Sequence, residues 1–573
     1  MSVATLTPEK INQVEKPNNG IGGLKHWRHD LIAGLVVSLV SVPFSSGIAL
    51  ASGVDPIYGI ISAIIGGLVL SFIGGSYVTI GGPAAGLAPA IYSGMLMLGK
   101  GSLKAGYPLL LPVICLTGLA QIILCKFRAA KFSEVFSSSA IQGMLTAIGI
   151  MIIAKQIPLF IGHPYQAHEF WGIIFETPKE FLLMNQKVFA VGFITLILIF
   201  VFAAQTKKIK LLRAFPPQII AVVIGTVLGV ALKLNSRFLI NIPKNPLSHG
   251  IMLPDFKSLF MDSSLWYSAV IIVLTLTLID STESLATIKA IDKIDPFRRK
   301  SDPDKTLFAV GVAKICSSIV GGLTIIPGGV KSSTCIMAGG RTQWANFYNA
   351  CFLLLYLFLF RDYINLIPLT VLSAVLIYTG FKLCRPGIWY QVACIGIEQL
   401  IVFSFTVFLT LTTDLLWGIC GGILLELLIT TGFIFSTERK RLQIANGNGN
   451  GLHNPLQILK RQFQNPVKKN EMLKGEYHLF FDKPLVCFNS LHLNRELSNI
   501  PAEAKCAYLH LTKGVTLIDH TTCESLLGLI EQNNLEGKTT INVVGMECMK
   551  SCSTYPSSMR LVDLEQEEAM NLI

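Results

Sequence analysis

A soluble protein carries about 25% charged residues, whereas this chain of 573 residues is 14% charged and 51% hydrophobic, which excludes an ordinary soluble protein. The 47 basic and 35 acidic side chains give a net charge of +12, and the positive residues gather in loops between apolar runs. We therefore attribute the charge to membrane topology and expect contact with membrane lipid, not nucleic acid. The 13 cysteines show neither a CxxC pair nor zinc-ligand spacing, so we expect no disulfide framework and no such metal site.

The N-terminal stretch MSVATLTPEKINQVEKPNN is polar and contains no cleavable signal peptide. We expect a cytoplasmic segment over 1–28. A membrane domain is predicted over 29–436, because apolar runs near the ~20-residue length that crosses a bilayer recur through it. We count about fourteen runs, with boundaries accurate to a few residues: 30–49, 57–73, 82–98, 107–125, 137–160, 187–204, 215–233, 265–287, 305–322, 331–338, 345–360, 366–383, 399–414 and 416–435.

The third and tenth runs are too short, or too rich in Gly and Pro, to cross a membrane as ordinary helices. They occupy corresponding places in two halves of seven runs each. Interrupted segments at matching places predict an inverted repeat of seven plus seven spans, with a binding site near the middle of the membrane.

Lys and Arg residues in short loops predict the orientation of the membrane domain. One loop, 233–257, is basic on the opposite side, but the loops after five even-numbered runs agree with one another. We therefore expect both termini in the cytoplasm. The absence of eukaryotic targeting signals favours the plasma membrane of a bacterium, its inner membrane, as the location. The agreeing basic residues are Lys126, Arg128, Lys131, Lys207, Lys208, Lys210, Arg213, Lys293, Arg298, Arg299, Lys300, Lys382, Arg385, Arg439, Lys440 and Arg441.

After residue 436 the composition changes. Residues 437–474 are polar and basic and include the repeat NGNGNG at 446–451, which predicts a flexible linker. Over 475–573 we expect a small soluble α/β domain of its own. Its predicted elements are paired strands in YHLFF and LVCFN, a buried strand in AYLHL, a helix in TTCESLLGLIEQNN and a strand in TINVVGM.

Two interrupted stretches, IGGPAAGLAPA at 80–90 and IPGGVKSST at 326–334, would each lead into a short helix. Non-helical backbone at membrane depth is tolerated where it is buried in protein or lines a cavity. A helix start offers free N–H groups and a positive dipole end, so the two starts predict an anion site. Alternatively, the glycines would only allow close helix packing. The candidate anion-binding residues are Pro43, Gly82, Pro83, Ala84, Ala85, Gly328, Gly329, Lys331 and Ser332.

Pro43 belongs to the first run, where SVPFSSG interrupts an apolar helix with a cluster of hydroxyls. These groups would face a substrate, or the segment is a plain proline kink. Three further charges within apolar runs, Lys155, Lys314 and Glu426, are better explained by internal pairing or by side chains that extend to the interface.

Two acids lie within the eighth run, and such residues are rare in spans, costly and usually functional. Asp280, Glu283 and Thr287 follow an i, i+3, i+7 spacing and share one helix face. Glu283 and Thr287 supply oxygens for a coupling Na⁺, and Glu283 could instead accept a proton or neutralise Lys331. The alternative is a structural ion pair, above all for Asp280.

These stretches resemble the SulP family of sulfate-permease-type anion transporters over nearly the whole chain. The resemblance rests on SVPFSSGIALASGVDPIYG, GGSYVTIGGPAAG, ESLATIKAIDKIDP, GGLTIIPGGVKSS followed by AGGRT, and YTGFKL. The tail resembles the family's STAS domain through LHLTKGVTLIDHTTCESLLGL. The resemblance implies an inverted repeat with core and gate subdomains and a homodimer to which the STAS domain contributes.

The resemblance also implies roles for single residues. Glu283 matches the family's acidic residue near the substrate or the coupling cation, and Thr287 matches a hydroxyl that can join a sodium site. Lys331 stands where many members have an anion-facing Arg, and Lys lacks the bidentate fork of that residue. In the tail, Asp519 fits the family's IDxT/S-type turn, whereas Thr521 and Thr522 replace the usual Ser–Gly. The resemblance therefore does not favour a phosphorylation switch there.

The sequence therefore predicts a secondary active transporter of an inorganic oxyanion, sulfate or bicarbonate, coupled to Na⁺ or H⁺ through alternating access. Two alternatives remain: a carrier of organic dicarboxylates or nucleobases on the same fold, and a mainly regulatory membrane protein that acts through its STAS domain. We expect neither an enzyme nor ATP-driven transport, because no nucleophile–base motif and no GxxxxGK[ST] loop occurs. No cofactor is predicted beyond a coupling Na⁺.

Overall fold

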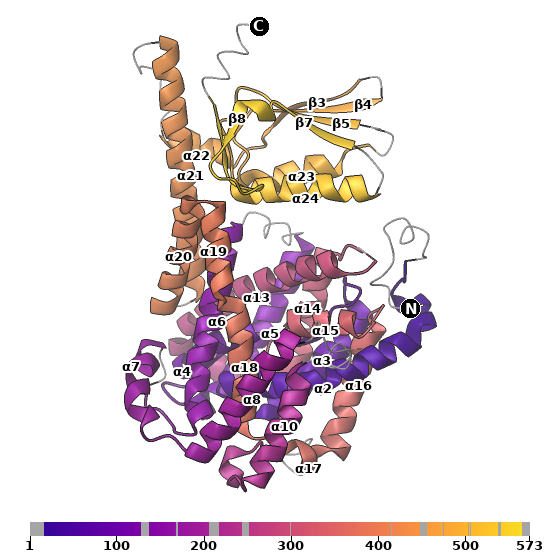
Figure 1. The fold of residues 1–573 in the computed structure, drawn as a ribbon, viewed down its shortest axis with the longest axis vertical. Coiled ribbons are helices and arrows are strands. Elements are labelled where there is room, and N and C mark those ends of the chain that lie inside the picture. Colours follow the sequence, from indigo (N-terminus) through magenta and orange to yellow (C-terminus); the bar gives the residue numbers. More distant parts are fainter. Residues whose placement is uncertain are drawn as a thin grey trace. The chain divides into compact units, whose positions relative to one another are not determined.

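The computed structural model describes residues 16–127, 137–167, 170–205, 217–242, 251–297, 299–413, 415–446, 455–473, 475–501, 504, 506–536 and 540–563. The chain divides into two compact units (Figure 1). The first comprises Met1–Ala130 and Ile148–Cys384, and the second comprises Lys131–Ala147 and Arg385–Ile573.

The first unit is helical, and each predicted apolar run in it contains a helix. Over both units, eight described helices are long and apolar enough to cross a membrane. The helices of the first unit are α2 (Trp27–Ala51), α3 (Pro56–Ile73), α4 (Ala88–Leu98), α5 (Leu103–Lys126), most of α6 (Ser138–Ile161), α7 (Phe170–Phe181), α8 (Gln186–Gln205), α10 (Pro217–Ala231), α12 (Phe256–Met261), α13 (Trp266–Ile294), α14 (Pro303–Ile319), α15 (Gly329–Met337), α16 (Trp344–Leu359), α17 (Arg361–Ile364) and α18 (Leu369–Cys384).

A short antiparallel strand pair organises this unit. Strand β1 (Gly81–Pro83) pairs with β2 (Ile325–Pro327), so that Gly82 lies opposite Ile326. β1 leads through a 3-10 turn into α4, and β2 leads into α15. At 1.5 Å per residue the two helices are about 17 and 14 Å long, about half of a bilayer's hydrocarbon core. The pairing thus joins the starts of the two helices that the sequence predicts to be incomplete.

Glycines allow a close crossing of two helices, α5 and α14. A Cβ atom on Gly118 would lie 2.6 Å from the carbonyl oxygen of Gly311, and a Cβ on Gly311 would lie 2.7 Å from that of Gly118. Small residues at such a crossing let two backbones touch. Gln121 of α5 and Lys314 of α14, one turn further along, are thereby brought together.

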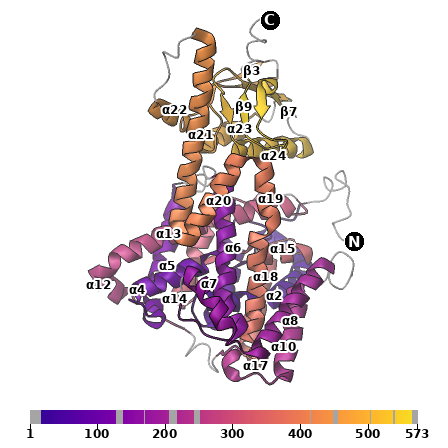
Figure 2. The same ribbon diagram turned by 60° about the vertical axis from the view of Figure 1, so that its left-hand side comes forward.

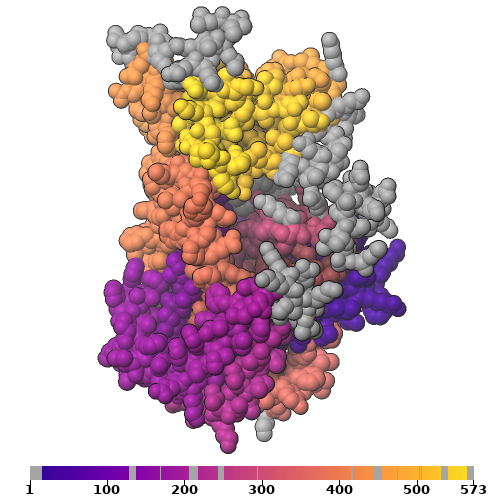
Figure 3. Space-filling model, viewed as in Figure 1, coloured from indigo at the N-terminus to yellow at the C-terminus, as the bar shows by residue number. Residues whose placement is uncertain are grey.

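Large apolar side chains are exposed on α7, α8 and α10, which form the purple and magenta surface in Figure 3. A soluble protein rarely exposes so many large apolar side chains on neighbouring helices, whereas lipid contact requires them. The exposed residues include Phe175, Phe193, Ile197, Phe200, Val223, Val227 and Val230.

The second unit combines the first turns of α6 with six further helices and two small sheets. These helices are α19 (Pro386–Ile395), α20 (Ile397–Thr412), α21 (Leu415–Asn446), α22 (Pro455–Gln462), α23 (Ser490–Ser498) and α24 (His520–Glu536). One sheet has the order β3-β4-β5-β7, with strands Val467–Leu473, Glu476–Phe481, Cys506–Leu511 and Thr540–Val544. β3 is antiparallel to β4 and the other neighbours are parallel. A second sheet joins β6 (Leu517–Ile518), β9 (Arg560–Val562) and β8 (Met549–Ser551).

Helices α23 and α24 cover one face of the first sheet (Figure 1). Leu479, Phe481 and Leu509 of the sheet share an apolar core with Leu493 of α23 and Leu526 of α24. The alternation of buried and partly exposed residues along β4 and β5 is the period-two pattern of a sheet with one covered face.

The predicted linker over 437–474 is wrong for the part of it that the structure describes. α21 continues to Asn446, α22 follows, and β3 forms the edge strand of the sheet. Figure 2 shows the whole length of α21. Residues 447–454 of this segment, with most of the NGNGNG repeat, lie outside the described residues.

The predicted pairing of YHLFF with LVCFN is also wrong. β4 has β3 as its antiparallel neighbour, whereas Leu485 makes one parallel bridge to Ile518. Asn489 ends the extended segment, because its side chain accepts a hydrogen bond from the Val486 N–H and donates to the Pro484 carbonyl. That bonding closes a 3-10 turn over Cys487–Asn489. The other three predicted elements of the tail correspond to β5, α24 and β7.

Several residues used to predict orientation fall outside the described residues, so the orientation stays a prediction. They are Arg128, Lys131, Lys207, Lys208, Lys210, Arg213, Lys244 and Arg298.

Candidate anion site

Two helix starts form the centre of the site. α15 begins after Gly328, and the turn that leads into α4 begins after Ala84. Within the described part of the chain, no side chain caps either start. Uncapped first-turn N–H groups carry the positive end of the helix dipole, so both starts offer donors to an anion.

The predicted anion-binding residues differ in exposure. Gly329 is exposed, and Gly328 and Ala85 are partly exposed, so these backbone groups can be reached at the surface of the first unit. The other four residues are buried beneath that surface: Pro43, Gly82, Pro83 and Ala84.

Lys331 lies in the first turn of α15 and is fully buried. Its Nζ donates to the Gly81 carbonyl oxygen at 3.3 Å and lies 5.9 Å from the centre of the Phe44 ring. A Cβ atom on Gly82 would overlap this Nζ. No described carboxylate forms an ion pair with it. A buried cation with only a carbonyl partner is costly, and a bound anion would offset that cost.

Ser332 has a different role from the predicted one. Its hydroxyl accepts a hydrogen bond from the Ile80 N–H at 2.9 Å and donates to the Gly328 carbonyl at 2.7 Å. The Gly328 N–H in turn donates to the Ile80 carbonyl at 2.8 Å. The Ser332 hydroxyl thus connects Ile80, just before β1, with Gly328, just before α15. Because its proton is already donated to Gly328, it is not free to donate to an anion.

The acids of α13 separate into two environments. Glu283 is partly exposed, and its buried Oε2 has no hydrogen-bond partner among the described residues. A Cβ on Gly86 would lie 2.5 Å from this oxygen, so Glu283 faces the first helix start. One turn on, the Thr287 methyl lies 3.8 Å from the Cβ position of Gly329, at the second helix start. α13 thus runs past both starts.

Asp280 is fully buried and forms an ion pair with Lys314 of α14. This is the structural alternative that the sequence left open for Asp280. The other alternative, a neutralisation of Lys331 by Glu283, is not found, since these two residues form no ion pair in the structure.

Two asparagines of α16 contact the site but were not predicted from the sequence. The side-chain oxygen of Asn346 accepts from the Gly81 N–H at 3.2 Å, and that of Asn349 accepts from the Ser41 hydroxyl at 3.1 Å. They tie β1 and α2 to α16. The available signal was their spacing of three residues within an apolar run.

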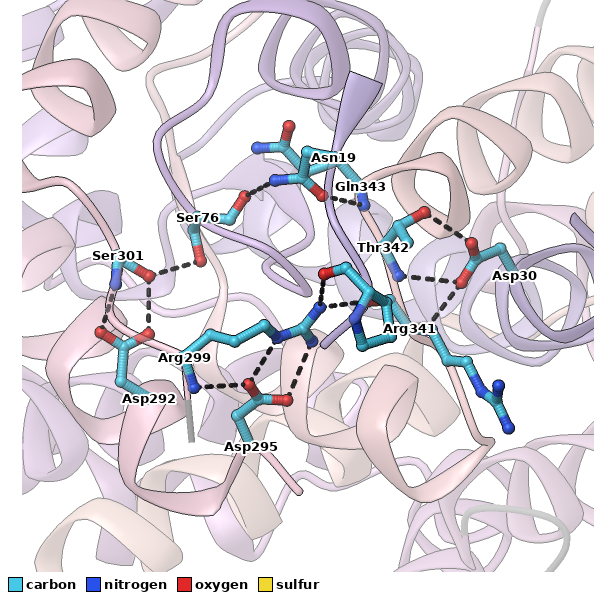
Figure 4. A network of polar contacts seen from close by, with 11 residues as sticks. Asn19, Asp30, Ser76, Asp292, Asp295, Arg299, Ser301, Arg341, Thr342 and Gln343 are labelled. Atoms are coloured by element: carbon cyan, nitrogen blue, oxygen red, sulfur yellow. Dashed lines mark hydrogen bonds and ion pairs between the residues drawn. The ribbon is translucent and has the colours of Figure 1, made fainter. Parts of the chain in front are cut away.

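A polar network fixes the loops at one end of the helices that carry the site (Figure 4). Arg299 is buried and donates to both carboxylate oxygens of Asp295, from Nε at 2.8 Å and from Nη2 at 3.0 Å. Its Nη1 also donates to the carbonyl oxygens of Pro17 and Arg341, both at 2.8 Å. Arg299 is thus more than the topology signal that the sequence suggested, because it joins the end of α13 to the loop after α15.

Asp30 holds the same loop from the opposite side (Figure 4). One oxygen accepts from the N–H groups of Arg341, at 2.7 Å, and Thr342, at 3.1 Å. The other oxygen accepts from the Thr342 hydroxyl at 2.6 Å. Both ends of α15 are therefore held, by β2 at its start and by this carboxylate after its end.

In the α/β domain, Asp519 accepts hydrogen bonds from the N–H groups of Cys487, at 2.5 Å, and Thr522, at 2.7 Å. Burial raises the pKa of Asp519 above its usual value. The Thr521 hydroxyl accepts from the Ser138 N–H at 3.0 Å, and Thr522 is fully buried. Both threonines thus belong to the packed start of α24.

Comparison with known proteins gives consistent matches. The sulfate permease family matches residues 27–406. The putative sulfate transporter YvdB of Bacillus subtilis is 24% identical over 419 residues, which cover 73% of this chain and 74% of that protein. The bicarbonate transporter BicA of Synechocystis sp. is 22% identical over 423 residues, which cover 73% and 72%.

Solved structures show the same fold. The transmembrane domain of a cyanobacterium bicarbonate transporter BicA superimposes with a TM-score of 0.60 at 21% identity, covering 69% of this chain and 98% of that one. The overall structure of SLC26A9 gives a TM-score of 0.63 at 14% identity, covering 95% and 87%. The predicted class, a helical membrane protein with a C-terminal α/β domain that fits a STAS domain, is confirmed.

Proposed function

Because the chain belongs to the sulfate permease family, we propose that it is a secondary active transporter of an inorganic oxyanion, sulfate or bicarbonate, driven by Na⁺ or H⁺. One observation carries the proposal: the buried Lys331 has no carboxylate partner among the described residues and lies beside two uncapped helix starts. The names of the relatives, sulfate and bicarbonate transporters, support the same substrate class.

In the proposed mechanism the anion binds to the N–H groups at the two helix starts, through Ala85 and Gly329, with Lys331 behind them. A cation or a proton at Glu283, with Thr287 as a second oxygen donor, offsets the remaining negative charge. The buried, unpartnered Oε2 of Glu283 fits such a cation. Alternating access then carries the loaded site from one side of the membrane to the other.

The assembly and placement of the protein belong to the same proposal. We expect a homodimer in the plasma membrane, with both termini in the cytoplasm and the STAS domain contributing to the dimer. The basic loops support this orientation.

The alternatives use the site less well. An uncharged nucleobase would leave Lys331 without a counter-charge, while an organic dicarboxylate would satisfy it and stays the closer competitor. A mainly regulatory protein would have no need of an unpaired buried cation at a membrane-embedded helix start.

Uptake of labelled bicarbonate and sulfate into proteoliposomes tests the function, with and without gradients of Na⁺ and H⁺. We expect one anion to accumulate under one gradient and Glu283→Gln to abolish the dependence on that gradient. Glu176→Gln is the control, because this acid bonds to the backbone of Gln166 and Ala167 away from the site. If neither anion moves under any gradient while dicarboxylates do, the oxyanion assignment is wrong.

A further inference from the structure

A second polar cluster lies beside the anion site and is not used by the proposed mechanism. It consists of Asp280 and Ser281 on α13, Lys314 on α14 and Gln121 on α5. Asp280, Lys314 and Gln121 are fully buried. Lys314 forms the ion pair with Asp280 and donates to Gln121 Oε1 at 2.8 Å, and Gln121 Nε2 donates to the Ser281 hydroxyl at 3.3 Å.

The cluster is built by the close crossing of α5 and α14. Gln121 and Lys314 each follow a crossing glycine, Gly118 or Gly311, by three residues, and so project from the same side of the contact. The Lys314 ammonium is therefore held in place from two helices. It occupies a pocket of oxygens, from a carboxylate and an amide, that would equally suit a free monovalent cation.

Four charged groups lie at the two helix starts and in the cluster beside them: Asp280, Glu283, Lys314 and Lys331. Asp280 and Lys314 neutralise each other, and Lys314 also lies within electrostatic reach of Glu283. Glu283 and Lys331 have no ion-pair partner among the described residues. This leaves one negative and one positive charge to be matched from outside.

We propose that Lys314 is a built-in cation that fills a second cation position on α13, so that the site takes one coupling cation per anion and not two. This inference rests on the proposed function and adds the stoichiometry to it. Lys314 acts as a positioning residue: by holding Asp280 neutralised, it leaves Glu283 as the carboxylate beside the helix starts that exchanges its cation. Removal of the ammonium would leave the buried Asp280 to acquire a cation from solution.

The test is the Hill coefficient for the driving cation, Na⁺ or H⁺, in anion uptake by proteoliposomes. We expect a value close to one for the wild type and for Lys314→Arg, which keeps the positive charge. Lys314→Met should need a roughly tenfold higher cation concentration and show a coefficient approaching two. The double variant Asp280→Asn/Lys314→Met should return to a coefficient close to one. Lys155→Met is the control, because Lys155 lies over the Tyr92 ring, at 4.3 Å, and not in the cluster.

A second measurement does not depend on transport. Added Na⁺ or a lower pH should raise the melting temperature of purified Lys314→Met, since a ligand that binds the folded state stabilises it, and should leave that of the double variant unchanged. An unchanged Hill coefficient together with no cation-dependent stabilisation in Lys314→Met overturns the inference, as does a double variant no better than Lys314→Met. Wild-type uptake that ignores both gradients would instead refute the proposed coupling, whatever the melting data show.

Discussion

At the first helix start, two glycines leave room for charged groups that come from other helices. Lys331 Nζ lies where a Cβ of Gly82 would be, and Glu283 Oε2 lies against Gly86. The sequence pattern placed these glycines at the site, and its two interpretations, a backbone anion site and close packing, turn out to be compatible. The glycines allow close packing, and what packs against them is the charge of the site.

Gly86→Ala should therefore impair transport. The added methyl group displaces the Glu283 carboxylate, and a displacement of about 1 Å at a functional group can cost ~10- to 100-fold in rate. Gly94→Ala is the matched control on the same helix, because its Cβ would meet its nearest neighbour, Ile272 Cδ1, at 3.4 Å. Initial uptake rates of the two variants decide the matter; equal rates would mean that the Glu283 position is not critical.

Single residues were predictable where they violate a membrane rule. Lys331 and Glu283 stand out as charges within interrupted or apolar runs, and both lie at the helix starts. The pairing of Asp280 with Lys314 depends on the crossing of α5, α13 and α14, which no local pattern encodes. The role of Ser332 likewise depends on β1, 252 residues away from it in the chain.

At the scale of elements, buried polar groups hold the loops at one end of the helices that carry the site. The side chains of Arg299 and Asp295 are both only 3% exposed. The guanidinium carbon of Arg299 also lies over two aromatic rings, 4.6 Å from the centre of the Tyr77 ring and 4.9 Å from that of Phe297. A buried bidentate pair of this kind fixes geometry, and loss of one partner leaves the other charge unpaired.

Arg299→Ala should lower the free energy of unfolding by about 3–5 kcal/mol, because Asp295 would remain buried without its partner. Arg341→Ala should have little effect, since the network uses the backbone of Arg341 through its carbonyl and N–H groups. Thermal denaturation of the two purified variants compares them. A wild-type melting temperature for Arg299→Ala would show that the network does not hold these loops.

Elements were predictable from period and composition, and the errors have physical causes. The apolar runs and the tail elements β5, α24 and β7 agree with prediction because their patterns are strong and local. LVCFN reads as a strand, yet the Asn489 side chain closes a turn within it. The polar, basic composition of 437–446 suggested a linker, but the end of α21 is helical there.

At the scale of the whole molecule, the division into units differs from the division by composition. The predicted boundary separates 29–436 from 475–573, whereas the residues after Cys384 form one compact unit with the α/β domain. An apolar cluster explains this: Ile434 of α21 and Ile458 of α22 share a core with Phe488 and Leu517. Composition marks where a chain leaves the membrane but not which parts share a core.

Truncation after Gln464, which removes the α/β domain from its first strand onward, should expose the apolar cluster around Ile434 and lower the stability of the second unit. Labelled-anion binding should persist, because every proposed ligand lies in the first unit. Equilibrium binding and melting curves of the purified truncated protein measure both effects. Complete loss of binding by a folded truncated protein would show that the site needs the second unit.

The most direct test of the central claim is anion uptake by Lys331→Met compared with wild type and Lys155→Met. Lys331 is buried at the helix starts, whereas Lys155 is a partly exposed lysine of another span. We expect Lys331→Met to fold, to lose saturable oxyanion uptake and to require at least about tenfold more anion for any remaining transport. Lys155→Met should keep wild-type uptake. Unchanged uptake by Lys331→Met would contradict an anion site built from this ammonium and the two helix starts.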